Sequence, residues 1–105
     1  MIIKWEKIGL LYDPSNTVKH PKLLSHAANP LPVKIDKNLY RVFFSGRDVE
    51  NRSSIGAVDI DLVNRTIICE HPNPIFEHGP EGSFYADGVS IGNCYESNGT
   101  QFMLF

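Results

Sequence analysis

Seven prolines and eight glycines are spread along the 105 residues and divide the chain into short segments. Proline interrupts helices and central strands, and glycine weakens both. No segment has the repeat of about 3.6 residues between apolar side chains that an amphipathic helix requires. The sequence therefore predicts an all-β fold made of short strands.

Alternating apolar side chains, separated by turn residues, predict three antiparallel hairpins. They are expected at residues 33–44, at residues 54–70 and on both sides of the Asn98-Gly99 pair. Asn-Gly is a strong signal for a two-residue hairpin turn. Residues 71–82 are rich in proline, which cannot donate to a strand ladder, so this segment is predicted to be an ordered loop.

A weak internal repeat extends this pattern. Residues 40–43, Tyr-Arg-Val-Phe, resemble residues 102–105, Phe-Met-Leu-Phe, and each run follows a polar turn and a short strand. A repeat of about 40 to 60 residues with four strands per unit is typical of β-propeller blades. The final apolar strand has no turn after it, as expected for a chain cut within a second blade. The predicted architecture is about one and a half blades of antiparallel strands.

Composition limits the possible partners. Hydrophobic residues make up 42% of the chain and charged residues 21%, as in a globular unit. The 12 acids and 10 bases are scattered and give a net charge of −2. No basic stripe is present to neutralise phosphates, so nucleic acid is not an expected partner.

The chain also lacks the apolar segments of export and membrane insertion. Lys4, Glu6 and Lys7 interrupt the apolar residues near the N-terminus, unlike a signal peptide, and no run is long enough to span a membrane. We therefore expect a cytoplasmic location and no membrane contact. In that setting Cys69 and Cys94 are expected to be reduced and partly buried.

Five segments carry a resemblance to a known group of enzymes: "SHAANP", "YRVFFSGRD", "NRSSIGAVDID", "NPIFEHGPEGSF" and "DGVS". In this order they resemble the N-terminal part of the five-bladed β-propeller glycosidases related to glycoside hydrolase families 32, 43, 68 and 130. The resemblance runs from about Trp5 to Phe105 and covers about a third of such a propeller. It implies one partial domain, residues 1–105. The first blade is expected at about residues 25–75, and about residues 82–105 form the start of the second.

The resemblance also implies where catalytic acids belong. In these glycosidases one carboxyl group protonates the leaving oxygen, and another activates water or attacks the sugar. Here Asn29 and Tyr85 stand at positions where the relatives carry acids. Asp87 lies two residues after Tyr85, on the same face of an extended strand, which makes it the candidate catalytic residue. The alternative is a turn, because Asp-Gly favours positive backbone dihedrals.

The candidate substrate-binding residues implied by the resemblance are His26, Asn29, Arg47, Asp48 and Tyr85. The first two either contact a sugar at the pocket mouth or have local structural roles. Arg47 and Asp48 follow a strand end, and they either face a cleft or form an exposed ion pair at a turn. Tyr85 and its neighbour Phe84 are possible stacking platforms for a sugar ring.

Two further acid clusters are interpreted as non-catalytic. Asp59 and Asp61 share one strand face, which is expected to be the solvated face of an outer strand. Glu77, His78 and Glu81 have no zinc or calcium spacing and are expected to line the rim of the pocket. We expect no metal and no cofactor.

The implied function is part of a glycoside hydrolase or glycoside phosphorylase-like protein that acts on a glycosidic bond and is incomplete on its own. Its expected partner is a carbohydrate. Two alternatives remain: a non-catalytic carbohydrate-binding or scaffold propeller, and a small β domain that self-associates through open strand edges. The enzymatic assignment rests on the resemblance, whereas the all-β assignment rests on the residues themselves.

Overall fold

The computed structural model describes residues 1–16 and 20–105. Its elements are a single 3₁₀ turn, η1 (Pro14–Asn16), and six strands: β1 (Ser25–Asp36), β2 (Leu39–Arg47), β3 (Ser53–Asp61), β4 (Thr66–Glu70), β5 (Asn93–Ser97) and β6 (Thr100–Leu104). No helix in the described part of the chain is long and apolar enough to cross a membrane.

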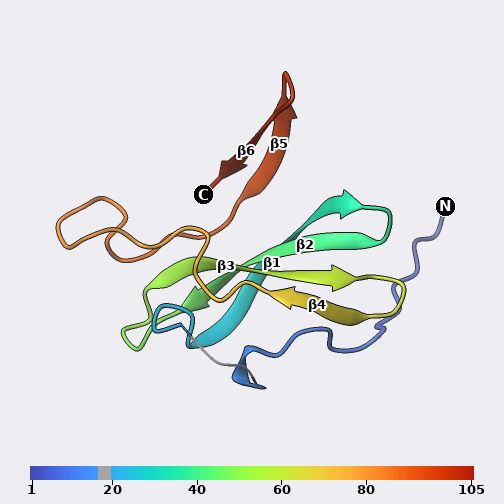
Figure 1. The fold of residues 1–105 in the computed structure, drawn as a ribbon, viewed down its shortest axis with the longest axis horizontal. Coiled ribbons are helices and arrows are strands. Elements are labelled where there is room, and N and C mark those ends of the chain that lie inside the picture. Colours follow the sequence, from blue (N-terminus) through green and yellow to red (C-terminus); the bar gives the residue numbers. More distant parts are fainter. Residues whose placement is uncertain (17–19) are drawn as a thin grey trace.

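The strands form two antiparallel sheets (Figure 1). The larger sheet has the order β1-β2-β3-β4, so every strand pairs with its neighbour in sequence. The smaller sheet is the β5-β6 hairpin, which projects beyond the larger sheet. The predicted all-β class is confirmed.

All three predicted hairpins are present. The first is longer than expected, because β1 begins at Ser25 and β2 continues to Arg47. In the third, Asn98 and Gly99 have φ angles of 50° and 77°, the positive values that a tight hairpin turn requires. Residues 71–82 contain no named strand, in agreement with the predicted loop.

The centre of the larger sheet is buried on both faces, whereas β4 and much of β1 are exposed. On one face Phe44, Val58 and Ile60 form a cluster, and Leu11 and Tyr12 of the N-terminal segment pack against it. On the other face Ile55 packs with Val89 and Ile91, and Met103 of β6 contacts this second cluster. The alternation of side chains along β3 supplies both clusters, so β3 is buried on both sides.

Gly56 allows the aromatic ring of Phe44 to lie directly on β3. A β-carbon at position 56 would lie 2.6 Å from Phe44 Cζ and 3.0 Å from Leu23 Cδ1. These separations are too short for carbon atoms, so the close approach depends on glycine.

The loop after β4 continues along β3. The amide of Ile55 donates to the carbonyl of Phe76 at 2.8 Å, and the amide of Ile75 donates back to Ile55 at 2.7 Å. Further on, the amide of Val89 donates to the carbonyl of Ser53 at 2.9 Å. The loop thereby occupies the part of β3 that β4 leaves unpaired and brings residues 85–90 to the start of β3.

Candidate functional site

Most of the candidate site residues lie at one end of the larger sheet. There the start of β1, the end of β2 and the start of β3 are in register, with Ser25 opposite Arg47 and Arg47 opposite Ser53. A parallel bridge from Ser53 to Gly88 adds the segment that contains Asp87. His26, Asn29, Arg47 and Asp87 are all exposed at this end of the sheet.

Two irregularities in β1 coincide with two of these candidates. The register shifts between Ser25 and Ala28 and again between Ala28 and Leu31. His26 and Asn29 lie within these shifts, with φ angles of 65° and 50°. Positive φ is uncommon outside glycine, and β-bulges re-aim side chains at sheet edges and next to active sites. The backbone of β1 therefore changes direction at the two residues that the resemblance singled out.

Asn29 is joined to the loop that carries Asp87. Its side-chain amide donates to Ser90 Oγ at 3.1 Å, and Ser90 Oγ lies 3.2 Å from Ser45 Oγ on β2. Asn29, Ser45 and Ser90 thus form a polar row across three segments. Neither serine could be identified from local sequence, because their proximity depends on the path of residues 71–92.

Asp48 has a different environment from the one expected of an exposed ion pair. Its side chain is only 6% exposed and pairs with Arg52, whose Nε lies 2.8 Å from Asp48 Oδ2. Asp48 Oδ1 accepts hydrogen bonds from the amides of Glu50 and Arg52, both at 2.9 Å. The expected partner, Arg47, is exposed. Asp48 therefore organises the turn between β2 and β3, and Arg47 precedes this turn with an exposed side chain.

These hydrogen bonds shift the pKa values of Asp48 and Arg52 in the turn. Burial acts to raise the pKa of Asp48, but the hydrogen bonds from Arg52 and Glu50 outweigh it and hold the pKa below its usual value. The hydrogen bond to Asp48 raises the pKa of Arg52, and the negative charge of Asp87 adds to this effect.

His78 was expected at the rim of a pocket, yet it is buried beside Asp48. Its Nε2 lies 3.3 Å from Asp48 Oδ2, but this contact lacks hydrogen-bond geometry, and the atom has no hydrogen-bond partner among the described residues. The amide of His78 donates to Ser54 Oγ at 3.0 Å. Of its two acidic neighbours in the sequence, Glu77 pairs with Lys22 and Glu81 is exposed.

Tyr85 lies inside the loop and is half-buried. Its ring lies 6.0 Å from that of Phe76 and 4.9 Å from that of Phe84. Its carbonyl accepts hydrogen bonds from the amides of Gly79 and Gly88. Tyr85 therefore contributes to the packing of the loop, whereas Phe84 is fully exposed at the loop surface.

A second polar cluster lies further along β3. Asp59 is buried and accepts hydrogen bonds from Arg41 Nε at 2.9 Å and Arg41 Nη2 at 3.1 Å. His71 Nε2 lies 3.2 Å from Asp59 Oδ1. The hydrogen bonds from Arg41, with a smaller contribution from His71, hold the pKa of Asp59 below its usual value despite its burial.

The expectation of a solvated outer face at Asp59 is wrong. It fails because β3 is an inner strand, flanked by β2 and β4. Asp61, at the end of β3, accepts hydrogen bonds from the amides of Val63 and Asn64 and forms the following turn. The cysteines are both free thiols, but Cys69 is exposed on β4 and only Cys94 is half-buried.

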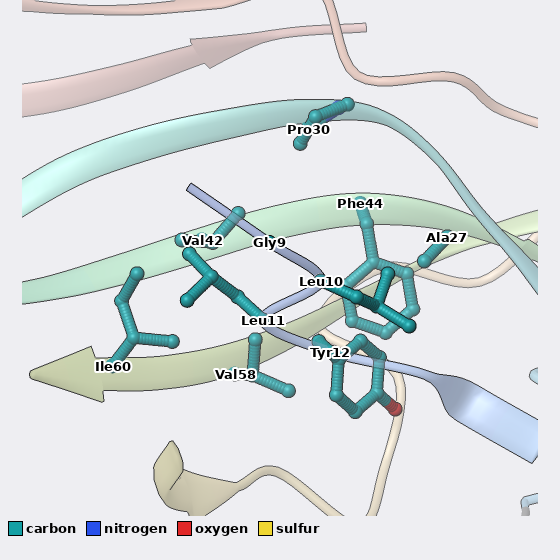
Figure 2. Close-up of a pocket in the computed structure, with 10 residues that line it drawn as sticks. All are labelled: Gly9, Leu10, Leu11, Tyr12, Ala27, Pro30, Val42, Phe44, Val58 and Ile60. Atoms are coloured by element: carbon teal, nitrogen blue, oxygen red, sulfur yellow. The ribbon is translucent and has the colours of Figure 1, made fainter. Parts of the chain in front are cut away.

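An apolar cavity of about 270 Å³ lies between residues 9–12 and the sheet (Figure 2). Val42, Phe44, Val58 and Ile60 form the sheet side of this cavity. None of the candidate site residues lines it. The cavity is therefore lined by core residues and by Ala27 and Pro30 of β1, and not by the candidate polar side chains.

Comparisons with known proteins give relatives without an assigned activity. No family model matches the chain, and no solved structure matches it. Two curated proteins of Mycobacterium tuberculosis, the uncharacterized proteins MT1551 (strain CDC 1551) and Rv1502 (strain H37Rv), are each 39% identical to the chain over 102 residues. The match covers 96% of this chain and 33% of each relative. The chain thus spans about a third of the length of the curated relatives it matches.

Proposed function

We propose that the chain forms the N-terminal part of a glycosidase-like β-propeller and contributes to a site that acts on a glycosidic bond. The chain-order meander of β1 to β4, followed by the β5-β6 hairpin, supports this proposal. Four antiparallel strands in sequence order are the unit from which propeller blades are built. In this proposal residues 25–75 make the first blade, and residues 82–105 begin the second.

One observation carries the functional part of the proposal: three segments place exposed polar side chains at the same end of the sheet. β1 supplies His26 and Asn29 at its two bulges, β2 ends with Arg47, and the loop supplies Asp87. A sugar offers hydroxyl groups that both donate and accept hydrogen bonds, so imidazole, amide, guanidinium and carboxylate groups all suit it.

The proposed roles differ between these residues. Asp87 is the carboxylate available for acid, base or nucleophilic chemistry. Arg47 and Asn29 bind substrate hydroxyls, and His26 contacts substrate at the outer end. Asp48 acts through the turn that it organises, because both of its oxygens are already bonded within the protein. Tyr85 holds the loop, and the exposed ring of Phe84 is available for stacking on a sugar.

The size of the relatives agrees with a site shared among blades. Each relative is about three times as long as this chain, which leaves room for the further blades of a five-bladed propeller. Blades bury their faces against neighbours, and β5-β6 exposes Tyr95, Phe102 and Leu104. In the proposed architecture the remaining strands of the second blade, and the blade after it, cover these side chains.

The proposal is tested with the full-length protein and a panel of activated aryl glycosides, with and without inorganic phosphate. We expect turnover of at least one glycoside, and we expect Asp87→Asn to lower kcat by about 100-fold or more, as for loss of a general acid-base group. Glu81→Gln is the matched control, because Glu81 is an exposed acid of the same loop. Its turnover should equal that of the parent protein.

Equal losses in Asp87→Asn and Glu81→Gln would remove Asp87 from the mechanism. Neither turnover nor binding of any glycan by the parent protein would contradict the proposed function itself. Binding without turnover would favour the second candidate, a non-catalytic carbohydrate-binding propeller. Asn29 favours that candidate, because it is an amide at a position where similar glycosidases carry an acid. Its NH₂ group donates a hydrogen bond to Ser90 Oγ.

A further inference from the structure

Three side chains of different chemistry converge on one face of the larger sheet, away from the proposed sugar site. They are Asp59 on β3, Cys69 on β4 and His71 just beyond β4. One ligand atom of each lies within 4.8 Å of those of the other two. Carboxylate, thiolate and imidazole are the three side-chain types that bind zinc in proteins.

Strand register explains this convergence. Asp59 and Cys69 are directly opposite each other in the β3-β4 ladder. His71 lies two residues after Cys69, and its amide donates to the carbonyl of Ala57, which continues the ladder by one step. Residues two apart on a strand share a face, so His71 lies beside Cys69 and diagonally across from Asp59.

We propose that Asp59, Cys69 and His71 bind a divalent transition metal ion, with zinc the best fit. The ion lies between Asp59 Oδ1 and His71 Nε2, which are 3.2 Å apart. Ligand atoms about 2.0 to 2.2 Å from a tetrahedral zinc ion are about 3.3 to 3.5 Å from each other, close to this separation. Cys69 completes the set, because its Sγ already lies within 4.8 Å of both other ligand atoms and its side chain is exposed.

The surroundings fit an ion with three protein ligands. Arg41 donates to both oxygens of Asp59, from Nε to Oδ1 at 2.9 Å and from Nη2 to Oδ2 at 3.1 Å, and so orients the carboxylate as outer-shell partners of metal ligands do. Oδ1 keeps a second lone pair for the ion. The exposure of Cys69 gives the ion access from solvent and leaves the fourth position to water. The bound ion would join the inner strand β3 to the edge strand β4.

The test uses Co²⁺ and Zn²⁺ with the intact protein, in the presence of a reductant that does not bind metal. One equivalent of Co²⁺ should produce a sulfur-to-cobalt charge-transfer band in the near ultraviolet. Cys69→Ser should abolish this band and weaken Zn²⁺ binding by at least about 100-fold, since loss of an outer-shell partner alone costs about 10- to 100-fold. His71→Gln and Asp59→Asn should weaken binding to a similar extent.

Cys94→Ser is the matched control, because Cys94 is the other free thiol and lies on β5. It should bind both ions like the parent protein. A Co²⁺ spectrum without the sulfur band, or equal affinities of Cys69→Ser and Cys94→Ser, would overturn the proposal.

A second measurement avoids substitutions altogether. Alkylation of the parent protein, followed by mass spectrometry of its peptides, should show that Zn²⁺ slows the modification of Cys69 by about 10-fold or more and leaves Cys94 unchanged, because a metal-bound thiolate is shielded from the reagent. Equal protection of both thiols, or of neither, contradicts a site at Cys69.

Discussion

Arg41 forms a bidentate ion pair with Asp59 and thereby links β2 to β3. Its Nε lies 2.9 Å from Asp59 Oδ1 and its Nη2 lies 3.1 Å from Asp59 Oδ2. The side chain of Asp59 is 12% exposed and that of Arg41 is 38% exposed. Such paired hydrogen bonds to a charged group are stronger than those between neutral groups. The pair also makes the stability of the sheet depend on pH.

Asp59→Asn tests this pH dependence. The pKa of Asp59 is lowered in the folded protein, so the unfolded chain binds a proton more readily than the folded one. The stabilisation by Asp59 is thus complete above the unfolded pKa of about 3.9 and is lost as the pH falls toward the folded value. We expect Asp59→Asn to lower the free energy of unfolding by about 1 to 3 kcal/mol near neutral pH.

Urea unfolding at about pH 7 and about pH 3 measures this effect, and the difference between parent and variant should shrink at the lower pH. Glu96→Gln, an exposed carboxyl on β5, serves as the control and should change stability by less than about 0.5 kcal/mol. A difference for Asp59→Asn that is the same at both pH values would contradict the role given to the ion pair.

Asp48→Ala is expected to destabilise the turn between β2 and β3. The substitution removes the acceptor for two backbone amides and leaves Arg52 without its main partner. Loss of hydrogen bonds to a buried charge predicts a decrease of about 2 to 4 kcal/mol in the free energy of unfolding. Arg47→Ala, at the adjacent exposed residue, should cost less than about 0.5 kcal/mol. Chemical denaturation of the two variants compares them directly, and equal losses would refute this account of the turn.

Gly56→Ala is expected to cost about 1 to 3 kcal/mol, because the new methyl group overlaps the ring of Phe44. The double variant Gly56→Ala/Phe44→Leu tests the cause, since it removes the ring atoms that the methyl group would meet. Its loss should be smaller than the sum of the two single losses, as for residues in contact. Thermal or urea unfolding of all four proteins completes the cycle, and additive losses would rule out the proposed clash.

Asn29 should tolerate glycine better than a β-branched residue. Its φ of 50° suits asparagine and glycine, whereas valine in this conformation is strained. We expect Asn29→Gly to change stability by less than about 1 kcal/mol and Asn29→Val to lower it by about 1 to 3 kcal/mol. Both variants lose the hydrogen bond to Ser90, so similar stabilities would show that backbone conformation is not the determining factor.

The hairpins could be predicted from sequence because their signals are local. Alternation at residues 55–60 and the Asn98-Gly99 pair depend only on neighbours in the chain. The position of β3 inside the sheet could not be predicted, because it depends on pairing with both β2 and β4. For that reason the sequence predicts a solvated face at Asp59, whereas the structure buries it.

In the candidate site, too, only some of the residues could be predicted from the sequence. The resemblance pointed to His26, Asn29 and Arg47, and the structure brings them to one end of the sheet. It did not identify Ser45, Ser90 or the burial of His78, since these follow from the route of the loop across β3. The path of the loop across β3 cannot be predicted from local sequence.

Residues 9–12 cover one face of the core without belonging to any strand. Segments outside the hydrogen-bonded ladders open at a lower free-energy cost than the sheet beneath them. Transient release of this segment would bare Phe44, Val58 and Ile60 while β1 to β4 remain paired. We therefore expect hydrogen exchange to separate two parts of the chain, with the amides of residues 9–12 exchanging faster than those of β1 to β4.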